Sequence, residues 1–137
     1  MEGYISSNNF NYYTIAKIHR AIQFAIGQSD WLSRKQLLEG LAFAGIPISY
    51  PQLYKDVELL KSCNISGFNH FKGDRGFDRS SSEIIVVFRW MATYRSRGQG
   101  VLHLPELLKL IRDYDNDNKQ QRHSATNQPI EVNSIPV

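Results

Sequence analysis

Basic, hydroxyl and amide side chains gather in three short stretches of the sequence, and together they suit a polyanionic partner. Arg and Lys bind phosphate oxygens, whereas Ser, Tyr, Gln and Lys also bond to the edges of bases in the DNA grooves. The candidate residues for contact with double-stranded DNA are Arg34, Lys35, Ser49, Tyr50, Gln52, Lys55, Lys72, Arg75 and Arg79.

Each of these candidates also has a local explanation that involves no DNA. Cations on exposed helix positions are often merely solvated, and residues 49–52 have capping or packing roles available to them. Arg75 can pair with Asp74 or Asp78 within a turn. The choice between the two explanations depends on where the folded chain places each side chain.

Residues suited to catalysis or metal binding do not form a recognisable pattern. The histidines, at positions 19, 70, 103 and 123, are scattered, and none has a second histidine or a cysteine four residues away. Cys63 is the only cysteine, and its apolar neighbours indicate packing rather than a nucleophile. We therefore predict no enzyme activity, no metal and no cofactor. The aromatic residues Phe71, Phe77, Phe88 and Trp90 are expected in the core rather than as a base-stacking platform.

Length and charge fit one small basic domain. The chain has 137 residues, a formal net charge of +3 and 42% hydrophobic residues, so a single core is expected. The positive excess lies before Tyr114, and the tail beyond it is slightly acidic. Because no signal peptide or membrane span is recognisable, we expect a cytoplasmic protein that does not bind membranes.

Hydrophobic spacing and capping signals predict a mainly α-helical fold. A first helix is expected from about Asn11 to Ile26, ending at Gly27. Two further helices each begin with a capping box, Ser33 with Gln36 and Ser49 with Gln52. The second of these, Tyr50 to Ser62, should bury Leu53, Val57 and Leu60 and present Lys55 on its opposite side. Gly45 suits the turn between the two helices.

The rest of the chain predicts a hairpin, two helices and a tail. Residues 65–77 alternate aromatics and glycines, with a basic tip at 72–76. Ser80 is expected to cap a long helix that ends near Gly98, and Pro105 to open a short one that ends near Asp113. The predicted organisation is a flexible N-terminus (1–10), one folded domain (11–113) and a disordered polar tail (114–137).

Two helices joined by a tight turn and followed by a basic hairpin form the geometry of a winged helix-turn-helix. The stretch from Ser49 to Leu60 resembles the recognition helix of bacterial regulators, with Lys55 at its basic position and Asp56, Val57 and Leu60 at its helix-supporting positions. Residues 75–77, the apolar stripe of the next helix and the stretch 98–108 are similar to the MerR family. The resemblance implies a transcription regulator, with residues 33–113 forming its DNA-binding part.

Two departures from the MerR pattern bear on assembly and regulation. The sequence shows neither a long coiled coil nor an effector site after the domain, and it has an extra helix in front. This layout is similar to the small MerR-type repressors of cyanobacterial CRISPR-associated transposons. The resemblance implies a repressor that binds a two-fold operator as a homodimer and needs no small-molecule effector. The expected dimer interface comprises Tyr13, Arg20 and Phe24, which lie off the buried stripe of the first helix.

A different class of function is also compatible with this fold. Winged helices also serve as adaptors in protein–protein interactions, in which case the basic hairpin would be merely solvated. A salt-dependent shift of DNA mobility would distinguish the two classes.

Overall fold

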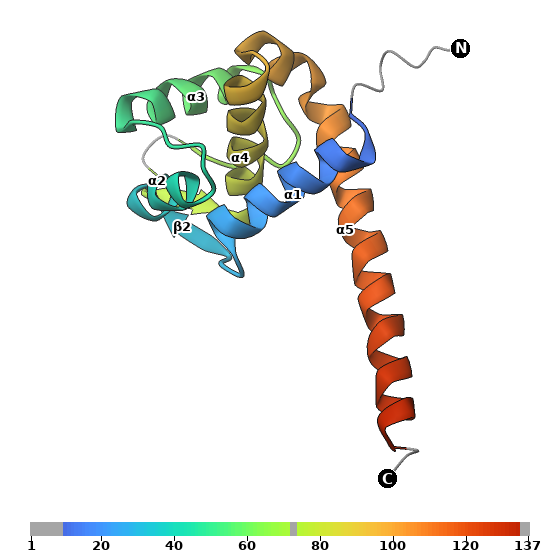
Figure 1. Ribbon diagram of the computed structural model, residues 1–137. Helices are drawn as coiled ribbons and strands as arrows, with labels where there is room; N and C mark the ends of the chain where they lie inside the picture. Colours follow the sequence, from blue (N-terminus) through green and yellow to red (C-terminus); the bar gives the residue numbers. More distant parts are fainter. Residues whose placement is uncertain (1–9, 72–73, 135–137) are drawn as a thin grey trace, which may run out of the picture.

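The computed structural model describes residues 10–71 and 74–134, and it is mainly helical with one small antiparallel sheet. Figure 1 shows a body of packed helices from which the last helix projects. The elements in chain order are α1 (Tyr12–Ile26), β2 (Trp31–Ser33), α2 (Arg34–Phe43), α3 (Tyr50–Ser62), β3 (Gly76–Asp78), α4 (Arg79–Tyr94) and α5 (Arg97–Ser134).

Helix α1 forms where the sequence predicts it. The Asn11 side chain caps it by accepting a hydrogen bond from the Thr14 N–H at 2.8 Å, and Gly27 ends it with a φ of 61°. Its buried stripe packs on α2 and α4, and a Cβ on Gly40 would overlap the Ala25 carbonyl. Phe10, expected in a flexible N-terminus, is instead buried edge-on against the ring of His103. The remainder of that predicted terminus, residues 1–9, lies outside the described residues.

The turn between α2 and α3 is specified by local hydrogen bonds. Gly45 has a φ of 85° and donates to Ala42, while the Ile46 N–H donates to the Leu41 carbonyl at 2.9 Å. This pair of bonds is a Schellman motif, and it satisfies carbonyls that the end of α2 leaves without partners. Ile46 is buried, so the turn is held at a fixed position on the core.

The two strands lie far apart in the sequence. β2 pairs with β3 in antiparallel register, with Leu32 opposite Phe77 and Ser33 opposite Gly76. The hairpin predicted within residues 65–77 is therefore wrong as a local pair: residues 65–71 form turns and irregular chain, and only β3 is a strand. The close approach of the two strands requires a glycine at position 76, because a Cβ there would overlap the Leu32 carbonyl and the Trp31 ring. The pairing places the segment before β3 beside the start of α2.

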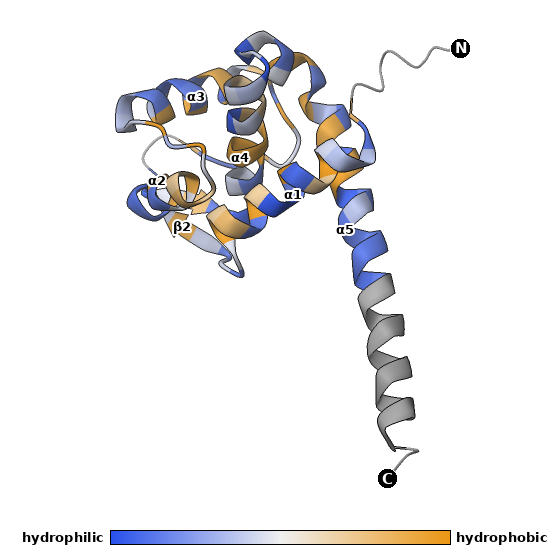
Figure 2. Cartoon of the chain, viewed as in Figure 1, coloured by the Kyte–Doolittle hydropathy of each residue, from blue (hydrophilic) through white to orange (hydrophobic). Residues whose placement is uncertain are grey.

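Helix α4 is the centre of the core, and its predicted start is off by two residues. Asp78, not Ser80, is the N-cap, and its carboxylate accepts from the Ser81 N–H at 2.8 Å. The Ser80 hydroxyl instead donates to the Gly67 carbonyl at 2.7 Å. Side chains on nearly all sides of α4 are buried. Figure 2 colours parts of α1, α4 and the first part of α5 as hydrophobic.

Helix α5 is much longer than the sequence predicts. It begins at Arg97, with the Ser96 hydroxyl accepting from the Gln99 N–H, and continues through Pro105 and beyond Asp113 to Ser134. The expected short helix and disordered tail are therefore replaced by one helix, and residues 135–137 lie outside the description. The Asp115 carboxylate supports it past Asp113, because it lies 2.9 Å from His19 of α1 and 3.1 Å from Lys119. None of the described helices is both long and apolar enough to cross a membrane.

Candidate nucleic-acid interface

The outer face of α3 carries a cation without an internal partner. Leu53, Val57 and Leu60 are buried, and Lys55 is exposed on the opposite side, as the spacing predicts. Among the described residues, no hydrogen bond or ion pair holds the Lys55 ammonium. It is therefore available to a phosphate or a base edge without first breaking an internal contact.

A buried ionic cluster behind this face holds α3 to α4 and α5. The Asp56 side chain is 0% exposed, and its Oδ1 accepts from Arg97 at 2.6 Å and from the Gln52 amide at 2.9 Å. Arg89 of α4 lies 3.6 Å from Oδ2, which is an ion pair too long for a hydrogen bond, so its Nε stays without a hydrogen-bond partner. Burial lowers the pKa of Arg89, and the charge of Asp56 opposes that shift.

The predicted DNA-contact residues Ser49, Gln52 and Arg79 have internal roles. Ser49 caps α3 through its hydroxyl, but the Gln52 side chain turns to Asp56 rather than closing the capping box or facing outward. The Arg79 guanidinium donates to the carbonyls of Gly27 and Ser29 and pairs with Glu83, so it fastens the loop after α1. Gln52 and Arg79 are therefore removed from the candidate interface.

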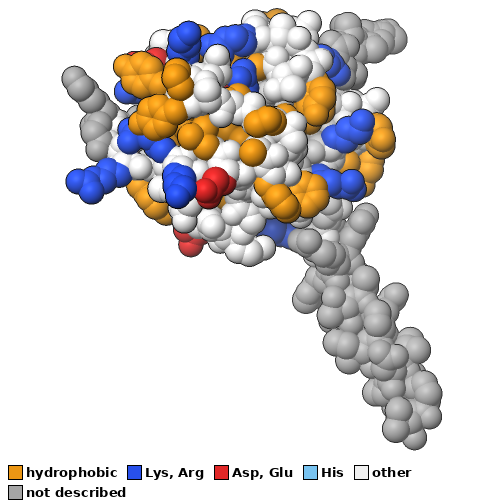
Figure 3. All heavy atoms as spheres, turned by 60° about the vertical axis from the view of Figure 1, so that its left-hand side comes forward, with side chains coloured by type: hydrophobic (Ala, Val, Ile, Leu, Met, Phe, Trp, Pro, Cys, Tyr) orange, Lys and Arg blue, Asp and Glu red, His pale blue; other side chains and the backbone are white. Residues whose placement is uncertain are grey.

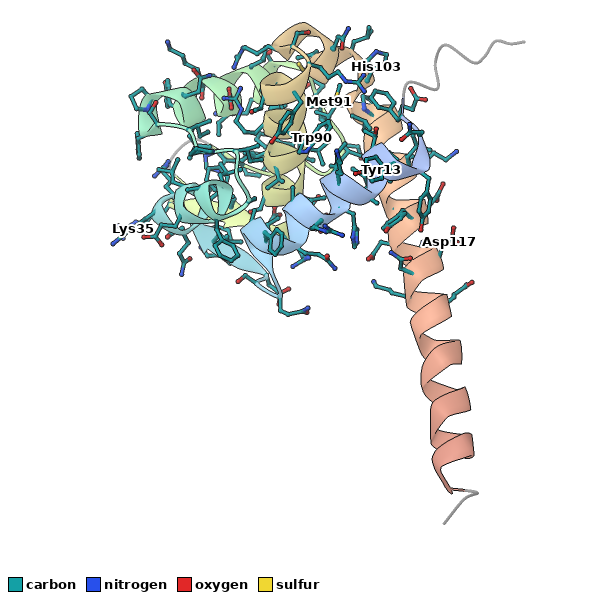
Figure 4. The ribbon with its side chains drawn as sticks, in the orientation of Figure 1. Tyr13, Lys35, Trp90, Met91, His103 and Asp117 are labelled. Atoms are coloured by element: carbon teal, nitrogen blue, oxygen red, sulfur yellow. The ribbon has the colours of Figure 1, made fainter. Side chains whose placement is uncertain are left out.

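The other candidates lie around the exposed ends of α2 and α3. Arg34 is half-buried and donates to the Asp74 carbonyl at 2.8 Å, which ties α2 to the segment before β3. Lys35 projects outward from α2, as Figure 4 shows, while Tyr50 and Arg75 are also exposed. Lys72 lies outside the described residues. Figure 3 shows Lys and Arg side chains alternating with hydrophobic ones on this side of the molecule, with few acidic side chains.

The segment before β3 is ordered by Asp74 and His70. The Phe71 N–H donates to the Asp74 carboxylate at 2.8 Å, and Phe71 is exposed rather than in the core as predicted. The His70 ring stacks on Phe77 at 4.4 Å and lies 3.2 Å from the Gly76 carbonyl. Burial lowers the pKa of His70, which favours the neutral ring, although that hydrogen bond and the nearby Asp74 charge oppose the shift.

A second aromatic residue on α3 was missed by the sequence analysis. Tyr54 is 62% exposed and lies with Tyr50 along one flank of α3, on the side of His70 and Phe77. These residues line a groove of about 320 Å³ between α3, the start of α2 and the segment before β3. Tyr54 follows Tyr50 by four residues, which places both on the same side of a helix. This spacing is the feature of the sequence that predicts their proximity.

The predicted dimer residues share one exposed face of α1. Tyr13 and Arg20 are exposed, and Lys17 between them stacks its ammonium over the Tyr13 ring at 4.5 Å. Phe24 contacts Phe43 of α2 edge-on at 5.5 Å, yet both rings stay at least half exposed. The face thus has an aromatic residue at each end and two cations in its middle.

Comparisons with known proteins identify no relative of this chain. No protein-family model matches the chain, and neither a curated protein nor a solved structure matches it.

Proposed function

We propose that this chain is a sequence-specific double-stranded DNA-binding protein of winged helix-turn-helix type, which regulates transcription as a repressor. The observation that carries the proposal is the outward face of α3. It presents Lys55 without a partner among the described residues, while a buried stripe and the Asp56 cluster fix the orientation of the helix. An α-helix fits the major groove, and side chains near its first turns reach base edges.

The neighbouring elements supply contacts to the DNA backbone in this proposal. The pairing of β2 with β3 and the bond from Arg34 to the Asp74 carbonyl place Arg75 beside the start of α2. Arg34, Lys35 and Arg75 would then neutralise phosphates on the strands that border the groove occupied by α3. A homodimer through the outer face of α1 would place two copies of α3 on a two-fold operator.

Selection of binding sites from genomic DNA with the purified protein tests the proposal directly. We expect an enriched two-fold sequence whose affinity falls as salt concentration rises. Lys55→Glu should lower affinity for that site by at least tenfold, because one lost contact costs about 1–3 kcal/mol and repulsion adds to the loss.

A matched control separates this effect from total charge. Lys109→Glu makes the same charge change at an exposed position of α5, and it should alter affinity far less. Circular dichroism checks that both variants fold. Recovery of no enriched sequence, together with equal affinity of the Lys55→Glu variant and the wild type for DNA, would reject the proposal and favour the adaptor function.

A further inference from the structure

The groove beside α3 has exposed aromatic side chains on its α3 side. Tyr50 and Tyr54 form one wall, and Phe77, which is 1% exposed, lies at its base with His70 stacked on it. A volume of about 320 Å³ lies at the lower end of the range of pockets that hold small ligands. The exposed rings of the two tyrosines favour a planar ring as the occupant.

The polar groups of the groove define what that ring must carry. The His70 side chain is 5% exposed, and its Nδ1 can donate to the Gly76 carbonyl. That bond makes Nε2 an acceptor, and the hydrogen bond and ion pair of the ring within the described part of the chain both involve Nδ1. The lowered pKa of His70 is consistent with a neutral ring that accepts at this atom. A fitting ligand therefore has an N–H on the edge of its ring.

The rim of the groove carries an excess of positive charge. Arg34 lines one side, where its only described bond is to a neutral carbonyl, that of Asp74. Lys61 and Glu58 both line another side, and their pairing at 3.4 Å is exposed and therefore weak, so the two cations outnumber the one acid. The ligand is thus expected to bear an anionic group in addition to its planar ring.

We propose that this groove binds a nucleoside 5′-monophosphate, with its base against the exposed rings of Tyr50 and Tyr54, a base N–H on His70 Nε2, and its phosphate at Arg34 and Lys61. A free mononucleotide and the terminal nucleotide of a 5′-phosphorylated strand share this chemistry. Binding also has a consequence that rests on the proposed function. Because Arg34 and Tyr50 belong to both the groove and the DNA-facing surface, an occupied groove lowers affinity for the operator.

Titration of the full chain with AMP, adenosine and inorganic phosphate, followed by calorimetry, tests the site. AMP is expected to bind with a Kd below about 1 mM, and adenosine and phosphate each at least tenfold more weakly. Tyr54→Ala and His70→Gln should each weaken AMP at least fivefold. Tyr94→Ala, which removes an exposed tyrosine of α4 outside the groove, should leave AMP binding unchanged. A 5′-phosphorylated dinucleotide that binds more tightly than AMP would identify a strand end as the source.

The outcomes separate this inference from the DNA-binding proposal. The Lys55→Glu variant should lose the operator yet keep AMP binding, because Lys55 lies outside the groove. No binding of AMP or of the dinucleotide at about 10 mM overturns the site, as does a Kd unchanged by both Tyr54→Ala and His70→Gln. AMP binding that leaves operator affinity unchanged overturns the regulatory consequence alone.

Discussion

Replacing Asp56 with asparagine should destabilise the protein strongly, although the change is nearly isosteric. In the Asp56→Asn variant the amide oxygen can still accept from Gln52 and Arg97, so the loss is mainly the negative charge. Arg89, whose side chain is 10% exposed, then lies beside no counter-charge. Breaking a buried pair in this way costs about 3–5 kcal/mol.

The geometry places the expected cost at the lower end of that range. The Arg89–Asp56 distance of 3.6 Å is longer than a hydrogen bond, and the two hydrogen bonds to the other oxygen survive the substitution. Arg97 contributes little to the cost, because its side chain is 41% exposed and its charge can turn to water. We therefore expect a loss of about 3 kcal/mol in the free energy of unfolding.

Urea denaturation followed by circular dichroism measures this loss. The control is Arg97→Ala, which should cost about 1 kcal/mol or less. In the double variant Asp56→Asn with Arg89→Met, both buried charges are gone, so the second change should restore much of the lost stability. A loss below about 1 kcal/mol for Asp56→Asn, or no recovery in the double variant, would refute the assignment of Asp56 and Arg89 as a stabilising pair.

Three further predictions concern Arg75, acid stability and assembly. Arg75→Ala should weaken binding to DNA of many sequences to a similar extent. It should also reduce the slope of log affinity against log salt concentration by about one unit, as measured by fluorescence anisotropy. A changed sequence preference would contradict a phosphate contact. The folded-state pKa of His70 lies below its unfolded value, so the unfolded state binds a proton first as pH falls. The free energy of unfolding should therefore decrease as pH falls below about 6.5. Urea denaturation at pH 7 and at pH 5 measures this decrease, and the His70→Gln variant should lack the part of it that His70 contributes. Across a two-fold contact between α1 helices, Lys17 and Arg20 of one copy lie near Lys17 and Arg20 of the other, and these positive charges repel. Sedimentation should therefore show a dimer whose affinity increases with salt concentration, which screens the repulsion, and with Arg20→Glu, which removes part of it. A monomer at micromolar concentration under all these conditions would exclude the dimer.

Local signals predicted the helices whose ends depend on neighbouring residues. Ser33 and Gln36 form the expected reciprocal capping box, and Gly45 adopts the expected left-handed conformation. Both features are decided within a few residues of sequence, so no knowledge of the core is needed. The inward stripe of α3 follows for the same reason, since helical periodicity alone separates Leu53 from Lys55.

The errors occur where two local signals compete. Asp78 and Ser80 are both good caps, and Asp78 prevails because the Ser80 hydroxyl bonds to Gly67. Hydrogen bonds from Asn69 and Ser81 lower the pKa of Asp78, although its burial acts to raise it, so the capping carboxylate stays charged. Pro105 favours a helix start, because inside a helix it removes one hydrogen bond and crowds the preceding turn, yet α5 continues through it. The long-range contact of Asp115 with His19 supports the extension of α5 past Asp113.

Long-range contacts decide which candidate side chains are available to a partner. The sequence presents Gln52 and Lys55 as equivalent polar residues on one helix, yet Gln52 bonds to Asp56 and Lys55 does not. The difference arises because Asp56 is buried against Arg89 and Arg97, which lie on other helices far along the chain. A buried acid needs such cations, so an Asp beside an apolar stripe could have directed attention to arginines elsewhere. The same cluster fixes α3 from behind, which leaves its outer face free for a single rigid contact.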